Sequence, residues 1–161
     1  LKNLIKVIIP DNIQQLQSII PEINMLHIKV CLHNYKQEKL NYTVIDIVET
    51  FGETKKFHKL GSSVVLGGSI IERGGQNPLE AARYGAKILH GPNIDNFKDV
   101  YKLLKTLKVS KKNYTPKEIS SSIVFNKNKS IGNNIKRIGE NILKNTIKEL
   151  DKIIINEFKK T

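Results

Sequence analysis

The sequence predicts an α/β protein built on a Rossmann-like, doubly wound parallel sheet, with amphipathic helices at its C-terminal end. Short runs of β-branched and aliphatic residues alternate along the chain with segments of helical pattern, which is the order of βαβ units. These runs are apolar throughout, which favours strands buried on both faces. A chain of 161 residues is long enough to bury a core and is expected to form one structural domain overall.

The elements are expected in a definite order. Strands are predicted over residues 4–9, 25–32, 43–48, 63–66 and 86–90, and the polar residues 33–42 are expected to turn. One helix is capped by Asp11 and ends at Ile20, a short one covers 52–60, and one capped by Asp95 ends near Leu107. The next helix begins at Thr115, with Pro116 in its first position and Glu118 closing a capping box.

The last part of the chain carries a helical stripe of isoleucines. Ile131, Ile135, Ile138 and Ile142 recur at spacings of four, three and four, and the stripe continues to Phe158 after an expected break near Asn145. Residues 129–161 are therefore predicted to form C-terminal helices that pack on a Rossmann-like domain of residues 1–128. A helix lying on a membrane is the less favoured alternative, because the apolar face lacks tryptophan.

Composition limits the classes of protein. The net charge of +12 is uneven, since residues 1–96 carry +2 and residues 97–161 carry +10, which suits contact with anionic lipid. Nucleic-acid binding is disfavoured, because the chain has only three arginines. The single cysteine, Cys31, excludes a disulfide framework and is expected to be buried. No apolar run reaches the length of a membrane span. Because the chain starts at Leu1, we interpret it as a piece of a longer protein.

Residues 64–93 contain the most informative pattern. A buried strand runs into Gly67-Gly68, and a second pair, Gly74-Gly75, leads to the predicted helix start at Asn77. Paired glycines free the backbone to present N–H groups at the positive end of a helix, which suits a phosphate. A capping box of Asn77 and Glu80 explains those two residues without a ligand, but it does not explain the glycines. We therefore favour a nucleotide or nucleotide-sugar site. The four histidines show no metal-ligand spacing.

At these residues the chain resembles the C-terminal, donor-binding half of the Kdo transferases, the glycosyltransferases that attach 3-deoxy-D-manno-octulosonic acid to the lipid A precursor. The family pattern is a Gly-Gly-Ser turn, then Gly-Gly-His-Asn-Pro-Leu-Glu, then a Gly-Pro loop followed by Asn-Phe, with Met-Gly-Glu upstream. This chain has the matching segments Phe51-Gly52-Glu53, Gly67-Gly68-Ser69, Gly74-Gly75-Gln76-Asn77-Pro78-Leu79-Glu80, Gly91-Pro92 and Asn96-Phe97.

The resemblance implies the second Rossmann-like domain of a GT-B enzyme. The donor would be CMP-Kdo and the acceptor a lipid A precursor, with inverting transfer, no metal and no cofactor. Backbone N–H groups around Gly68, Ser69, Gly74 and Gly75 would hold phosphate. The other donor-binding residues would be Gln76, Asn77, which supports the cap, Glu80, which takes the ribose, and Glu53, which lies near the nucleotide.

Catalytic residues are expected in an N-terminal domain that this chain lacks. The chain alone is therefore predicted to be soluble and inactive. The full-length enzyme would work at the cytoplasmic face of the bacterial inner membrane, and residues 97–161 could contact anionic lipid there.

Two departures from the family pattern affect the donor. Gln76 stands where the family usually has His, which removes a charged contact but keeps a hydrogen-bond donor. Pro10-Asp11-Asn12 stands where the family usually has Pro-Arg-His, and Gln15 stands where it has a further Arg. Asp11 puts a negative charge where the family has a positive one. Either the affinity for the nucleotide-sugar donor falls, or this segment is no longer used in binding. The alternatives are a GT-B domain for another nucleotide sugar, a degenerate binding module and a basic interaction protein acting through residues 97–161.

Overall fold

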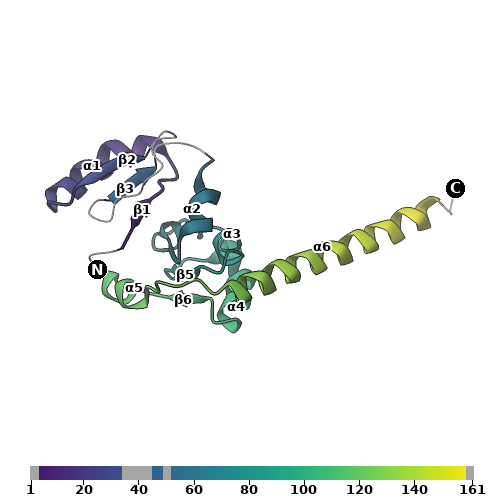
Figure 1. The fold of residues 1–161 in the computed structure, drawn as a ribbon. Coiled ribbons are helices and arrows are strands. Elements are labelled where there is room, and N and C mark those ends of the chain that lie inside the picture. The colour runs from purple at the N-terminus through teal and green to yellow at the C-terminus, as the bar shows by residue number, and fades with distance from the viewer. Residues whose placement is uncertain (1–3, 34–44, 49–51, 159–161) are drawn as a thin grey trace. The chain divides into compact units, whose positions relative to one another are not determined.

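The computed structural model describes residues 4–33, 45–48 and 52–158. The chain divides into two compact units, Leu1–Phe57 and His58–Thr161, which are described separately (Figure 1).

The first unit holds a three-stranded parallel sheet in the order β1-β3-β2. The strands are β1 (Lys6–Ile8), β2 (Val30–His33) and β3 (Ile45–Val48), and Ile45 of the central strand is in register with Lys6 and Val30. A short 3-10 helix, η1 (Ile13–Gln15), leads into α1 (Leu16–Met25). The core of this unit consists of the buried residues Leu16, Ile23 and Ile47.

Four predictions in the first unit are corrected. Asn12, not Asp11, is the cap, because the Asn12 side chain accepts a hydrogen bond from the N–H of Gln14. The helix does not end at Ile20 but continues through Pro21 to Met25, because that extension buries Ile23. The strand expected from residue 25 therefore begins only at Val30, and Cys31 on it is half-buried. The turn predicted over 33–42 lies outside the described residues, apart from His33 in β2.

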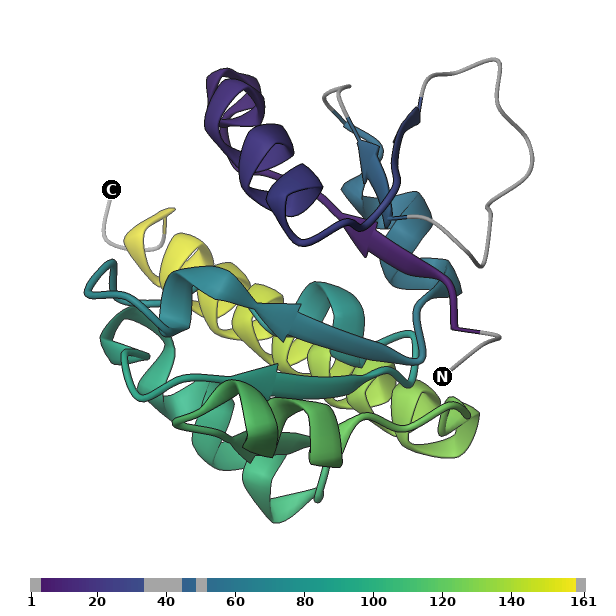
Figure 2. The same cartoon turned by 90° about the vertical axis from the view of Figure 1, so that its left-hand side faces the viewer.

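The second unit holds another three-stranded parallel sheet, in the order β4-β5-β6. Figure 2 shows β4 and β5 as two teal arrows that run in the same direction, with Leu66 in register with His90. The elements of this unit are β4 (Ser63–Leu66), η2 (Gly67–Ser69), α3 (Leu79–Ala82), β5 (Lys87–His90), η3 (Asp95–Phe97), α4 (Lys98–Thr106), β6 (Ser110–Lys112), α5 (Pro116–Ser122) and α6 (Lys129–Phe158). The helix α2 (Thr54–Leu60) spans the boundary between the units.

Buried residues from β4, α3, β5, α4, α6 and the adjoining loops form one core, namely Leu66, Ala81, Ala82, Ala86, Ile88, Tyr101, Leu104, Val109 and Ile135. Thr115 caps α5 as predicted, since its Oγ1 accepts from the N–H of Glu118, and Pro116 is the first helical residue. Asp95 does not cap α4. It lies in η3 and pairs with Lys98 at 2.7 Å. Strand β6 was not predicted, because Ser110-Lys111-Lys112 has no apolar pattern.

The C-terminal helix α6 is one continuous helix of 30 residues, so the predicted break near Asn145 is wrong. Asparagine costs a helix interior less than 1 kcal/mol relative to alanine, and no glycine or proline stands beside it. Ile131 and Ile135 pack on the core as expected. Beyond Ile138, however, every described side chain of α6 is exposed, so the predicted packing covers only the first part of the helix.

The predicted α/β class with parallel strands is confirmed. The boundary predicted at residue 128 stays a prediction, although α6 does begin at Lys129.

Candidate functional site

The buried Ser69 joins the loops that leave β4 and β5. Its hydroxyl donates to the carbonyl of Leu66 at 2.6 Å and accepts from the N–H of Gly91 at 2.8 Å, while its own carbonyl accepts from the N–H of Asn93. A Cβ on Gly91 would collide with the Ser69 backbone, so the contact requires glycine. The loops that leave the carboxyl ends of β4 and β5 therefore meet within this unit.

The glycine pair Gly74-Gly75 lies against the segment that follows β5. Both residues have positive φ angles, of 75° and 85°, which glycine adopts without strain. The carbonyl of Gly74 accepts from the N–H of Asn96, and a Cβ on Gly75 would lie 3.0 Å from the carbonyl oxygen of Asn93. Within the described part of the chain, the N–H groups of Gly74 and Gly75 have no hydrogen-bond partner. Two adjacent backbone donors thus remain available to a ligand.

Gln76 connects the two glycine segments. Its side-chain oxygen lies 3.4 Å from the N–H of Gly68, within hydrogen-bond distance, and its backbone carbonyl accepts from the hydroxyl of Tyr101. The ring of Tyr101 in turn packs on the ring of His90, with centroids 4.4 Å apart. The N–H of Gly68, which was predicted to hold phosphate, is thus directed at Gln76 in this structure.

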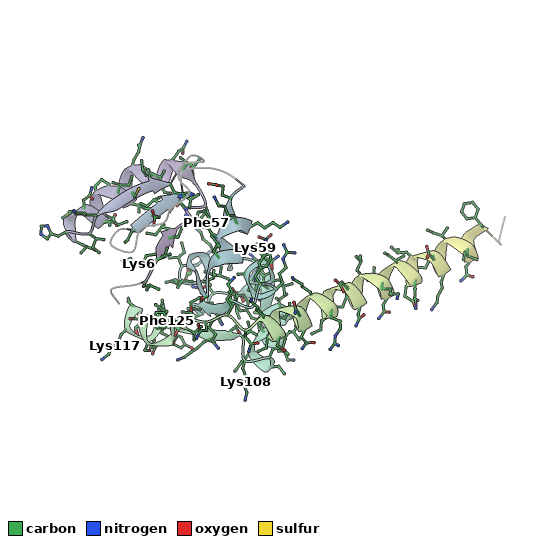
Figure 3. All side chains as sticks on the ribbon, in the orientation of Figure 1. Lys6, Phe57, Lys59, Lys108, Lys117 and Phe125 are labelled. Carbon is green, nitrogen blue, oxygen red and sulfur yellow. The ribbon has the colours of Figure 1, made fainter. Side chains whose placement is uncertain are left out.

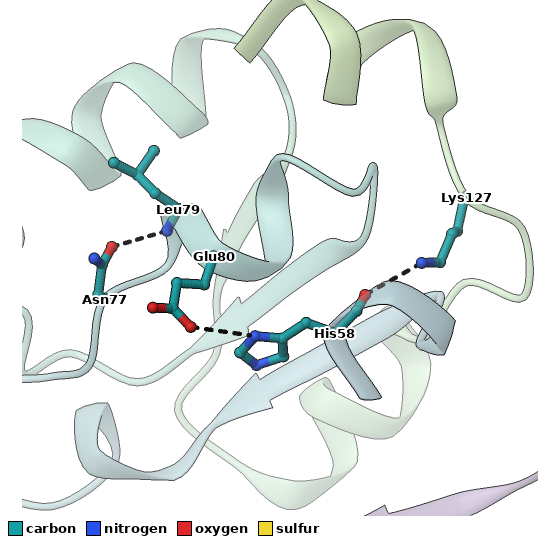
Figure 4. Close-up of polar contacts among 5 residues, drawn as sticks. All are labelled: His58, Asn77, Leu79, Glu80 and Lys127. Carbon is teal, nitrogen blue, oxygen red and sulfur yellow. Dashed lines mark hydrogen bonds and ion pairs between the residues drawn. The ribbon is translucent and has the colours of Figure 1, made fainter. Parts of the chain in front are cut away.

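Asn77 and Glu80 act separately rather than as a capping box (Figure 4). Asn77 Oδ1 accepts from the N–H of Leu79, the first residue of α3, so Asn77 supports the helix start as predicted. The Glu80 carboxylate, by contrast, points toward His58, with Oε2 3.8 Å from Nδ1. Because α3 has only four residues, its N-terminus carries less than a full helix dipole. An anion at this position would therefore be held mainly by hydrogen bonds from individual N–H groups.

His58 is the residue that lies beside Glu80. It is 9% exposed, and burial lowers the pKa of its imidazole. The negative charge of Glu80 raises that pKa, whereas the positive charges of Arg83 and Lys127 lower it further. The ammonium of Lys127 donates to the carbonyl of His58 at 3.2 Å (Figure 4). No local pattern could have paired His58 with Glu80, because 22 positions of the sequence separate them.

Glu53 and the loop with Asp11 and Asn12 belong to the first unit. Glu53 precedes α2, its carboxylate lies 3.5 Å from the ammonium of Lys56, and its side chain is 11% exposed. Its predicted place near the nucleotide stays a prediction.

Among the described residues, no cluster of three or more His, Cys, Asp or Glu side chains is arranged to hold a metal ion. Within the same residues, no helix combines the length and the apolar character needed to cross a membrane.

No protein-family model matches the chain. It is 26% identical, over 98% of its length, to a bifunctional glycosyltransferase/methyltransferase of Fusobacterium nucleatum, of which it covers 27%. Two 3-deoxy-D-manno-octulosonic acid transferases also match. That of Bordetella pertussis is 37% identical over 34% of this chain and 13% of the relative, and that of Rickettsia prowazekii is 28% identical over 60% and 21%. The chain thus spans about a quarter or less of these relatives.

A solved structure shares the fold. The C-terminal CMP-Kdo binding domain of WaaA from Acinetobacter baumannii superposes with a TM-score of 0.65 over 71% of this chain and 60% of that chain, at 16% identity. The relatives confirm the resemblance predicted from the glycine motifs, and the superposition confirms the fold class. In sequence and in fold, the chain is similar to the C-terminal domain of the Kdo transferases.

Proposed function

We propose that this chain is the donor-binding domain of a glycosyltransferase and that it binds CMP-Kdo at the loops that follow β4 and β5. The adjacent, unpartnered N–H groups of Gly74 and Gly75 support this proposal most directly. They would donate to the phosphate of the donor, as backbone N–H groups in glycine-rich loops do for other nucleotides. The Kdo transferases among the relatives favour CMP-Kdo over other nucleotide sugars.

Glu80 would accept hydrogen bonds from the two ribose hydroxyls. Its carboxylate is 52% exposed, which leaves it accessible, and its orientation is influenced by His58 beneath it. On binding, the side-chain oxygen of Gln76 would release the N–H of Gly68. That N–H group would then be a third hydrogen-bond donor to the phosphate. Ser69 completes the set within the second unit by holding the two loops together. Glu53 belongs to the first unit, and its place near the nucleotide stays a prediction.

Transfer itself would need a second domain. We propose that a complete enzyme carries out inverting, metal-independent transfer to a lipid A precursor at the cytoplasmic face of the inner membrane, with its catalytic residues outside this chain. The chain alone would then transfer no Kdo. The basic excess lies in residues 98–137, and its exposed lysines would face anionic lipid, at about 1 kcal/mol for each that reaches the surface.

The test is a titration of the chain with CMP, in which NMR spectra monitor the backbone amide signals. A second titration with UMP provides the comparison. We expect shifts at Gly68, Ser69, Gly74 and Gly75 with CMP and smaller ones with UMP. Equal shifts with both nucleotides would favour another nucleotide sugar. The absence of shifts at millimolar CMP would contradict the proposed site.

A matched pair of variants tests the N–H groups. Gly75→Ala places a Cβ at a φ of 85° and 3.0 Å from the Asn93 carbonyl, so the loop must shift and CMP affinity should fall about tenfold or more. Gly139→Ala makes the same chemical change on an exposed helix position where a Cβ meets nothing within 4 Å. It should leave CMP affinity unchanged. Equal affinity in both variants would exclude the Gly75 loop from the site.

A further inference from the structure

The second half of α6 presents an apolar face that no described residue of its own unit covers. Figure 1 shows this half, drawn in yellow, running clear of the strands and helices of the same unit, and Figure 3 shows its side chains standing free along the helix. The exposed fractions of its large apolar side chains are high, at 61% for Leu143, 48% for Ile147, 53% for Leu150, 51% for Ile154 and 80% for Phe158. An apolar face of this length on one helix indicates a missing partner.

This face is not a continuation of the one that packs on the core. Ile131, Ile135 and Ile138 share one side of the helix, whereas Leu143, Ile147, Leu150 and Ile154 share another, about 120° away at ~100° per residue. Beyond Ile138 the first side keeps Ile142 and Ile153, both 60% exposed, but Asn145 and Glu149 interrupt it, whereas the second side is apolar in every turn from Leu143 to Ile154. Packing on the core of the second unit accounts for the first stripe but not for the second.

The spacing of the second stripe is that of a coiled coil. Leu143, Ile147, Leu150 and Ile154 follow one another at four, three and four residues, which places leucine at the d positions and isoleucine at the a positions of a heptad. Isoleucine at a with leucine at d is the combination that favours two helices over three or four. A two-helix seam is therefore the arrangement that this sequence suits.

The charges beside the stripe indicate which way the helices run. Lys144 and Asp151 occupy the e positions, and within the described residues neither forms an ion pair. In an antiparallel pair, Leu143 meets Ile154 of the partner copy and Ile147 meets its Leu150. The e positions then face one another, so each Lys144 lies opposite an Asp151. In a parallel pair Lys144 would face Gly139 and Asp151 would face Thr146, with no charge to complement.

A lipid surface suits this face less well. Residues 139–158 contain four acidic and three basic residues, so the half-helix has a net charge of −1, although the whole chain carries +12. Interfacial helices that bind anionic lipid carry lysine and arginine in excess on the polar face. The basic excess lies elsewhere, on residues 98–137.

We propose that two copies of this chain associate through an antiparallel pair of α6 helices, with Leu143, Ile147, Leu150 and Ile154 as the seam and Lys144 paired with Asp151 of the partner. The contact is isologous, since each copy supplies the same residues. Glu140 occupies the core position before Leu143, which limits the seam to four layers. The interface therefore falls at the small end of specific interfaces, and we expect a weak dimer whose population depends on concentration.

The test is sedimentation equilibrium of the chain between about 5 and about 500 µM. We expect the mean mass to rise from 18.3 kDa toward twice that value. Ile147→Asp should keep the chain monomeric at every concentration. Because Ile147 is exposed in the monomer, its thermal unfolding at low concentration should match the unaltered chain. A monomer throughout would overturn the proposal, as would a dimer that Ile147→Asp leaves intact.

Charge exchange separates the antiparallel arrangement from the parallel one. Lys144→Asp and Asp151→Lys should each weaken the dimer about fivefold to tenfold, and the two changes together should restore it. Lys148→Asp makes the same charge change on the polar face and should have no such effect. Single variants without effect would overturn the antiparallel pairing. Binding of the stripe to phosphatidylglycerol vesicles, with no dimer in their absence, would assign the face to lipid instead.

Discussion

Nine buried residues form the core of the second unit, whereas three form that of the first, within the parts of the chain that the structure describes. In the second unit, side chains from β4, α3, β5, α4 and α6 meet in that core. In the first unit, Met25, Leu26 and Leu32 are 80%, 69% and 41% exposed. The glycine loops thus stand on the unit that buries more apolar surface by itself, which is what a preformed ligand site requires.

The largest expected effect comes from the core of the second unit. Leu104 is 0% exposed, so Leu104→Ala should lower the free energy of unfolding by about 3 kcal/mol through lost burial and a cavity. Urea denaturation followed by circular dichroism measures this change. Leu60→Ala removes the same atoms from a side chain that is 58% exposed and should cost less than about 1 kcal/mol. Equal costs would mean that the core assignment is wrong.

Ser69→Ala should have the next largest effect. The Ser69 hydroxyl makes two hydrogen bonds to buried backbone groups, so its removal should cost about 2 kcal/mol and loosen the loops after β4 and β5. Ser121 offers a control, because its exposed hydroxyl makes one hydrogen bond, of 2.9 Å, to the Glu118 carbonyl, and Ser121→Ala should cost a few tenths of a kcal/mol. The measurement is thermal unfolding of the two variants side by side. A harmless Ser69→Ala would contradict the role of Ser69 in joining the loops.

A smaller change in the first unit tests whether the two units open separately. Ile47→Val removes one methyl group from a residue that is 0% exposed and should cost about 1 kcal/mol. Because the core of this unit is small, the loss should appear as faster hydrogen exchange in β1, β2 and β3, with β4 and β5 unchanged. Ile142→Val, at a residue that is 60% exposed, should alter neither. Faster exchange in both sheets would show that the units unfold as one.

Acid should weaken the second unit slightly. Burial lowers the pKa values of His58 and His90 below the ordinary value of 6.5, so as the pH falls through that value the unfolded chain takes up protons that the folded chain does not. The free energy of unfolding should therefore decrease as the pH drops below about 6.5. It should level off once the pH passes the folded-state pKa values.

The pH effect is measured as urea denaturation from pH 8 to pH 5, with residues of β4 and β5 as reporters. His58→Gln keeps a polar side chain without a titrating group and should flatten the dependence. An unchanged slope in that variant would assign the acid sensitivity to other groups.

Much of the fold was predictable because short-range rules govern it. Strand β4 has the predicted bounds, and Thr115-Pro116 begins α5 as a local cap should. The errors occurred where a distant contact decides an element. The burial of Ile23 extends α1 through Pro21, and β6 exists because it pairs with β5, since its own residues have no strand pattern.

The sequence by itself determined the parallel α/β class, the glycine loops and the likeness to the Kdo transferases, because glycine at positive φ and local caps depend only on neighbouring residues. Tertiary structure alone decided that Ser69 joins two loops, that His58 faces Glu80, and that α6 runs unbroken beyond its core. These features depend on side chains that the fold brings together from distant positions, and no local pattern encodes that proximity.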